Sequence, residues 1–212
     1  MNAKRIRLVG AATALAAVGA SAGCGQYVRQ GQSPSQIAII NFEAASGAQP
    51  SAFGGTLDSD VLTLVSRTVG GQQVLVPTVF SDVGRVAMRL VLKDQGAPGV
   101  TATPSALNQI TINRYRVVYR RTDGRNTQGV DVPFSFDSAT TFTVPSESAA
   151  SQSFEIVRHT AKEEAPLAAL RSSAVIIATV AEVTFYGRDL AGNDVSVVAN
   201  IGIQFGNFGD PQ

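Results

Sequence analysis

Five arginines lie close together near the middle of the chain and form its most concentrated charge. They are Arg114, Arg116, Arg120, Arg121 and Arg125. A guanidinium group binds carboxylates and phosphates through paired hydrogen bonds, so this strip is a candidate contact for an anionic glycan or a protein partner. A solvated sheet face with ion pairs to Asp131 or Asp137 on the following strand accounts for the same residues. The sequence leaves both interpretations open.

The side on which these arginines lie follows from the strand that they occupy. Residues 110–121 predict one long strand, in which alternate side chains face the same way. We therefore expect Arg114, Arg116 and Arg120 to share the solvent-facing side. Tyr115, Val117 and Tyr119 should pack in the core. The isoleucines at the start of this strand are out of phase with the tyrosines, which predicts a bulge near Asn113.

Residue combinations that support catalysis are sparse. A Ser-His-Asp triad would have to use His159, the only histidine, and no Gly-x-Ser-x-Gly turn accompanies it. A zinc site needs three or four nitrogen or sulfur ligands, which one histidine and one cysteine do not supply. No pattern marks a catalytic pair of carboxylates. We expect no enzymatic activity, and a carboxylate hydrolase is the least favoured alternative.

Acidic residues gather in two places where calcium could bind through oxygen ligands. One group is Asp58 with Asp60, and the other is Asp189 with Asn193 and Asp194. Neither group has the spacing of a helix-loop-helix calcium loop. Aspartate and asparagine are also common turn residues, which explains these positions without a metal. We therefore predict no metal site and no cofactor.

Cys24 is the only cysteine of the chain, and it directly follows a segment typical of a secretory signal. Three basic residues come before an apolar run over residues 8–18, and small residues precede the cysteine. Residues 1–23 are therefore predicted to be a signal peptide. The polar residues 24–36, with glycine and proline but no periodicity, are predicted to be a lipidated N-terminus and tether.

A cysteine in this position resembles the acceptor of bacterial lipoproteins, where it is lipidated and becomes the first residue of the mature chain. Gly25 favours the outer membrane, because aspartate at that position tends to retain such proteins in the inner membrane. Ser21 departs from the aliphatic residue usual three places before the cysteine. The alternative is ordinary cleavage after Ala22, which would leave a free thiol near a secreted N-terminus.

Removal of the signal segment changes the balance of charge. The chain has 17 Lys+Arg and 16 Asp+Glu, and three of the cations precede residue 24. Residues 24–212 therefore carry 14 cations against 16 acids, a net charge of −2. No global positive field is present to attract nucleic acid, and no intrachain disulfide can form. The 189 residues from Cys24 onward can bury one sizeable core or divide into two small domains, and we expect residues 37–212 to form one domain.

Short alternating apolar segments separated by polar turns predict an all-β domain. The expected strands lie at 37–42, 60–65, 74–79, 85–93, 110–121, 130–136, 140–144, 154–157, 175–186 and 195–205. Pro166 limits the one helical stretch, 161–171, to a turn or two. Each strand has an apolar face that needs a second layer, so about 8–10 strands should form an antiparallel sandwich or barrel.

The last hairpin, residues 183–194, resembles the closing hairpin of bacterial immunoglobulin-like domains, with Asp189 followed by Ala191, Gly192 and Asn193. The resemblance implies an immunoglobulin-like β-sandwich and concerns architecture alone, because the inter-sheet cysteines and core tryptophan of antibody domains are absent from the sequence. The whole chain also resembles predicted lipoproteins of environmental bacteria, which implies no activity.

Together these patterns predict an extracytoplasmic, membrane-anchored lipoprotein that acts without catalysis, through contacts with a protein or a surface. Its partners are expected to be the membrane, through the lipid on Cys24, and a protein or glycan of unknown identity. The alternative is a ligand-binding or carrier lipoprotein with a pocket between the sheets.

Overall fold

The computed structural model describes residues 32–94 and 102–208; the predicted signal peptide and Cys24 lie outside these ranges. The described residues form β1 (Ser35–Ala45), β2 (Thr56–Asp60), β3 (Thr63–Val69), β4 (Gln72–Thr78), β5 (Asp82–Leu92), η1 (Ala106–Asn108), β6 (Ile110–Arg120), β7 (Phe136–Val144), β8 (Ala150–Val157), α3 (His159–Glu163), η2 (Leu167–Ser172), β9 (Ile177–Asp189) and β10 (Asp194–Gly206). The predicted all-β fold is confirmed. None of the helices in these ranges has the length and apolar character needed to cross a membrane.

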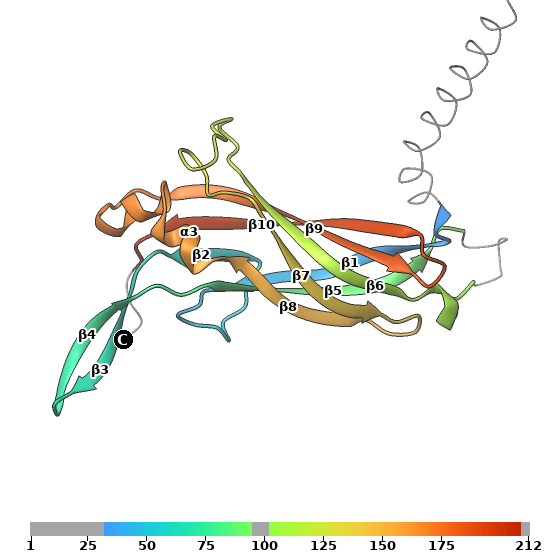
Figure 1. Ribbon diagram of the computed structural model, residues 1–212, viewed down its shortest axis with the longest axis horizontal. Helices are drawn as coiled ribbons and strands as arrows, with labels where there is room; N and C mark the ends of the chain where they lie inside the picture. Colours follow the sequence, from blue (N-terminus) through green and yellow to red (C-terminus); the bar gives the residue numbers. More distant parts are fainter. Residues whose placement is uncertain (1–31, 95–101, 209–212) are drawn as a thin grey trace, which may run out of the picture.

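Two sheets pack face to face as a sandwich (Figure 1). One sheet has three strands in the order β1-β5-β8, and the other has five in the order β2-β10-β9-β6-β7. Most neighbours are antiparallel, as expected, but β2 runs parallel to β10. The first strand begins at Ser35, so the last two residues of the expected tether belong to β1.

The inner faces of both sheets share one apolar core. Phe185 of β9, Phe154 of β8 and Tyr115 of β6 form an aromatic cluster across the layers, with ring centroids 4.9 to 6.2 Å apart. The two buried tyrosines of β6 also tie the sheets together. The hydroxyl of Tyr115 donates to the carbonyl of Glu155, at 3.0 Å, and that of Tyr119 to the carbonyl of Ile156, at 2.7 Å.

The strand patterns that alternate most regularly are reproduced in the structure. Strand β9 lies at the centre of the five-stranded sheet and pairs with β10 over their whole length. Gly192 takes a φ of +85° in the turn between them, where its lack of a side chain removes the usual steric cost. The predicted bulge is also confirmed, because the register of β6 shifts between Ile112 and Arg114 against both of its neighbours.

Residues 130–136 do not form the expected strand, and β7 begins only at Phe136. The backbone N–H of Asp131 bonds to the carbonyl of Thr127, while the Asp131 carboxylate accepts from the Thr127 N–H. These local bonds close a turn and leave Val130 and Phe134 exposed, at 67% and 55%. The strand predicted from the alternation of these residues with polar ones is therefore wrong.

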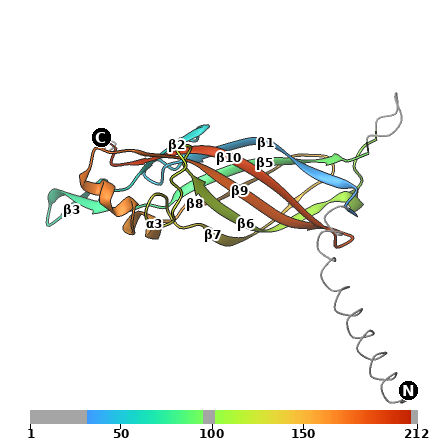
Figure 2. The same cartoon turned by 90° about the horizontal axis from the view of Figure 1, so that it is seen from above.

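The expected strand over residues 60–65 is likewise divided in two. Asp60 ends β2, and its carboxylate accepts hydrogen bonds from the N–H of Leu62 and the hydroxyl of Thr63. The chain turns there and enters the hairpin β3–β4, which pairs with no other strand of the described residues. This hairpin projects from one end of the sandwich, opposite the end where β1 begins (Figures 1 and 2).

The buried hydroxyl of Tyr119 gives a test of the inter-sheet contact. We expect Tyr119→Ala to lower the free energy of unfolding by about 3 kcal/mol or more, and Tyr119→Phe by about 1 kcal/mol. Burial raises the pKa of Tyr119, so the folded state disfavours its ionised form. The stability that depends on the neutral phenol is present below the unfolded pKa of about 10 and is lost as pH rises beyond it.

Urea unfolding measures the free energy of unfolding at about pH 8 and at about pH 11. The decrease between these two pH values should be smaller for Tyr119→Phe than for the wild type. An equal loss in both proteins would contradict the assignment of a buried, neutral Tyr119.

Candidate functional site

The arginine strip lies on the outer face of the five-stranded sheet, as its period predicts. Tyr115 and Tyr119 are each only 2% exposed, whereas Arg114, Arg116 and Arg120 are exposed on the opposite side of β6. The facing expected from the sequence is confirmed. The structure thus offers these three guanidinium groups to solvent, on a surface that neighbouring strands extend on both sides.

Each arginine of the strip contacts an acidic side chain on an adjacent strand. Asp137 of β7 accepts from both Arg114 and Arg116, at 3.2 and 3.4 Å, while Arg120 lies 3.6 Å from Glu182 of β9. All of these side chains are more than a third exposed, and such pairs contribute about 0–1 kcal/mol. The arginines of the strip are therefore all paired, but an incoming anion could replace their acidic partners at a small cost in free energy.

Arg121 and Arg125 do not belong to this strip. Both follow β6 in the loop and share the carboxylate of Asp123, at 2.6 and 2.9 Å. Their side-chain hydrogen bonds hold the pKa of Asp123 well below its usual range. Asp131, the other expected partner, instead closes the turn at Thr127. The five arginines that are grouped in sequence are thus divided between a sheet face and a loop.

A shallow hollow of about 190 Å³ opens beside the strip, at the bulge of β6. The bulge places Asn113 and Arg114 next to each other on the outer side of the strand. Gly187 of β9 lies opposite, where a side chain would collide with the carbonyl of Thr111. The lining residues are Asn113, Arg114, Tyr186, Gly187, Arg188, Asp194 and Val195.

The polar side chains of this hollow are held by one another. The guanidinium of Arg114 lies 4.1 Å above the ring of Tyr186, a cation–π contact, and Arg188 donates through Nε to Asp194 at 2.6 Å. Sequence reasoning missed Tyr186, Arg188 and Asp194 as companions of the strip. Only the register of β6 against β9 brings Arg114 opposite Tyr186.

A second hollow of similar volume lies elsewhere on the surface, beside β1 and β2. It is lined by Ala44, Ser46, Gln49, Ala52, Gly54, Thr56, Leu57 and Asp58. Neither hollow is the apolar pocket between the sheets that a carrier of the expected kind requires. The inner faces of the sheets are instead in contact through a continuous cluster of buried side chains.

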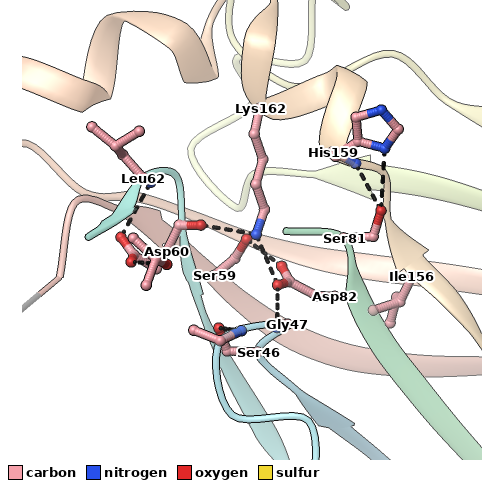
Figure 3. A network of polar contacts seen from close by, with 12 residues as sticks. Ser46, Gly47, Ser59, Asp60, Leu62, Ser81, Asp82, Ile156, His159 and Lys162 are labelled. Atoms are coloured by element: carbon pink, nitrogen blue, oxygen red, sulfur yellow. Dashed lines mark hydrogen bonds and ion pairs between the residues drawn. The ribbon is translucent and has the colours of Figure 1, made fainter. Parts of the chain in front are cut away.

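One fully buried charged side chain is a lysine that the sequence analysis did not identify as a candidate site. Lys162 of α3 extends toward the base of the β3–β4 hairpin, and its ammonium donates to Asp82 Oδ1 and to the Asp60 carbonyl, both at 2.8 Å (Figure 3). Asp82 also accepts from the hydroxyl of Ser59 at 2.6 Å and from the N–H of Gly47 at 2.9 Å.

This network joins residues on either side of the hairpin. Asp60 precedes β3 and Asp82 follows β4, so the ammonium of Lys162 fixes both ends of the hairpin to α3. Burial raises the pKa of Asp82, while the adjacent ammonium and the hydrogen bonds that it accepts oppose that effect. Both charged groups are buried, which is typical of a structural contact rather than a site open to a ligand.

The other candidates from the sequence have local roles. The N–H of His159 donates to Ser81 Oγ at 3.0 Å at the start of α3. Asp189 accepts from the backbone and the side chain of Asn193, which explains its place in the turn without a metal. Over residues 32–94 and 102–208, no group of three or more histidine, cysteine or acidic side chains is arranged to hold a metal ion.

Comparisons of this chain with protein-family models, curated proteins and solved structures gave no match.

The Lys162 network predicts a large effect of one substitution. Lys162→Met should lower the free energy of unfolding by about 3–5 kcal/mol, because it leaves Asp82 buried without its counter-ion. It should also make Arg67, in the released hairpin, more susceptible to trypsin. The exposed Lys93 supplies the matched control, and Lys93→Met should change stability by about 0.5 kcal/mol or less.

The double variant Lys162→Met/Asp82→Asn should lose less stability than the two single variants together, since the residues interact. A Lys162→Met protein as stable as Lys93→Met would contradict this account of the network.

Proposed function

We propose that this chain is a non-enzymatic, membrane-anchored module of the bacterial cell envelope that binds a partner through the outer face of its five-stranded sheet. The anchor is the lipid on Cys24, and the location is extracytoplasmic, at the outer membrane. The partner is a protein or a glycan. The observation that carries this proposal is the exposed strip of arginines on β6, whose ion pairs are individually weak.

The surface is suited to binding because its charged groups are positioned but not buried. Neighbouring strands hold Arg114, Arg116 and Arg120 in a row, and alternate residues of a strand are about 6.6–6.8 Å apart. Their acidic partners are exposed, so a competing anion would meet little desolvation cost. A partner with matching spacing would exchange ion pairs without disturbing the core.

We assign the domain to the immunoglobulin-like sandwiches. The order β1-β5-β8 corresponds to strands A, B and E of that fold, and β10-β9-β6-β7 corresponds to G, F, C and C′. The core contains an aromatic cluster that includes Tyr115, Phe154 and Phe185, and the domain lacks the cysteines and tryptophan of antibody domains. The proposed binding face is then the sheet that contains strands G, F and C.

The anchor is tested by Cys24→Ser. This variant should move from the membrane fraction to the soluble extracytoplasmic fraction, because two acyl chains supply stable attachment that one chain does not. Fractionation followed by mass spectrometry of the mature N-terminus measures the change. Continued sedimentation with membranes, or a mature N-terminus at Gly23, would rule out lipidation at Cys24.

The binding face is tested by a photo-crosslinking residue in living cells. Ser196 and Ser153 form a matched pair, because both are exposed serines in strands but lie on the outer faces of opposite sheets. We expect a discrete crosslinked product from position 196 and none from position 153. Arg116→Ser/Arg120→Ser should reduce that product while changing stability by about 1 kcal/mol or less.

Equal products from both positions, or none from position 196, would contradict the proposed binding face.

A further inference from the structure

We infer that the hollow at the Asn113 bulge is a binding site for an acidic sugar, a uronic acid within a glycan, and that the arginine strip extends this site along the polymer. The inference rests on the proposed function, since it specifies what the outer face of the sheet binds. It depends on the donors around the hollow, their surplus of charge and the size of the space.

The two guanidinium groups at the hollow are positioned in advance and retain donors for a ligand. Arg114 is held by the ring of Tyr186 beneath it and by an Nη1 contact to Asp137. Arg188 is held by Asp194 through Nε. A guanidinium carries five N–H donors, so each arginine keeps donors with which it could bind a carboxylate. Fixed side chains lose little entropy on binding.

Charge around the hollow and along β6 favours an anion although the predicted mature chain is negative. Asp137 serves both Arg114 and Arg116, so two cations share one acid. With Arg188 paired to Asp194 and Arg120 near Glu182, four arginines on β6 and β9 face three carboxylates around the hollow and the strip. Asp58, the exposed acid on the outer side of β2, lies opposite Gln204, near the end of β10 farthest from Asp194. The surplus of one positive charge lies beside the bulge, where the strip and the hollow meet.

The size and the lining of the hollow favour a sugar over a peptide or an apolar ligand. Its volume of about 190 Å³ is below the range of about 300–1,000 Å³ typical of sites for drug-sized ligands. Asp194 and the amide of Asn113 can accept hydrogen bonds from hydroxyl groups. Asp194 would also repel the closely spaced carboxylates of an acidic peptide. A uronic acid carries one carboxylate for the arginines and hydroxyls for these acceptors.

The bulge is the structural device that creates the site. An unbulged strand would place Asn113 and Arg114 on opposite sides of the sheet, because side chains alternate. The extra residue instead turns the side chains of Asn113 and Arg114 to the outer face. The backbone of β6 at the bulge then lies opposite Gly187 of β9. Bulges commonly redirect a side chain next to a binding site. From this point Arg116 and Arg120 continue along the strand as contacts for further sugar units.

The inference is tested by titration calorimetry of the soluble Cys24→Ser chain with trimers and hexamers of galacturonic acid. Neutral galactose oligomers of the same length and a hexaglutamate peptide are the comparison ligands. We expect binding of both galacturonate oligomers that weakens with added salt. Arg114→Gln/Arg188→Gln should weaken binding of both by about tenfold or more, since charge-assisted hydrogen bonds are lost.

Two further variants separate the hollow from the strip. Arg116→Gln/Arg120→Gln should weaken binding of the hexamer more than that of the trimer, because Arg120 lies about 20 Å along the strand from Arg114 and only the longer ligand reaches it. The control is Arg89→Gln, an exposed arginine on the outer face of the three-stranded sheet, and its affinities should match the unsubstituted chain.

Three results would overturn the inference: absence of galacturonate binding, hexaglutamate binding as tight as that of the hexamer, or an Arg114→Gln/Arg188→Gln variant that binds normally. If galacturonate does not bind while the crosslink from position 196 persists, the sugar assignment fails and the proposed binding face stands. If the crosslink is also absent, both fail.

Discussion

The requirement that β6 cover the core with every second side chain determines the surface on which a partner could bind. Tyr115 and Tyr119 reach across the sandwich and donate to carbonyls of β8, which fixes the face that β6 turns inward. Arg114, Arg116 and Arg120 must then lie outside, in one row. The core contacts of β6 therefore fix where the strip lies, although its own ion pairs contribute little stability.

Charged groups have two different roles in this molecule, and burial separates them. On the outer face the pairs are exposed, and Asp137 is shared between two arginines, so the surface remains able to exchange partners. At the base of the β3–β4 hairpin, Lys162 and Asp82 are removed from solvent and every contact is short. Removing either partner would leave the other charge buried without a counter-ion. The Lys162–Asp82 pair is therefore a structural contact.

Three local irregularities, a bulge, a turn and a close backbone approach, shape the parts of the fold outside the regular strand pairing. The bulge at Asn113 opens the hollow on the outer face, and Gly187 allows the close approach of the bulged strand. Asp60 interrupts a segment that would otherwise continue as one strand, and its turn starts the projecting hairpin. Gly47 brings its N–H to Asp82 at a position where a side chain would collide with the backbone at Ser81.

The sequence by itself determined the all-β class, the facing of β6, its bulge and the closing hairpin, because the two-residue period of a strand and the chemistry of a turn are local properties. The strand expected at Val130 and Phe134 does not form, because the hydrogen bond that the Asp131 carboxylate accepts from the Thr127 N–H closes a turn there instead. The hollow, the companions of Arg114 and the pairing of Lys162 with Asp82 were decided only by tertiary structure. Those contacts join residues far apart in sequence, and their existence depends on strand order and register, which alternation within one strand does not encode.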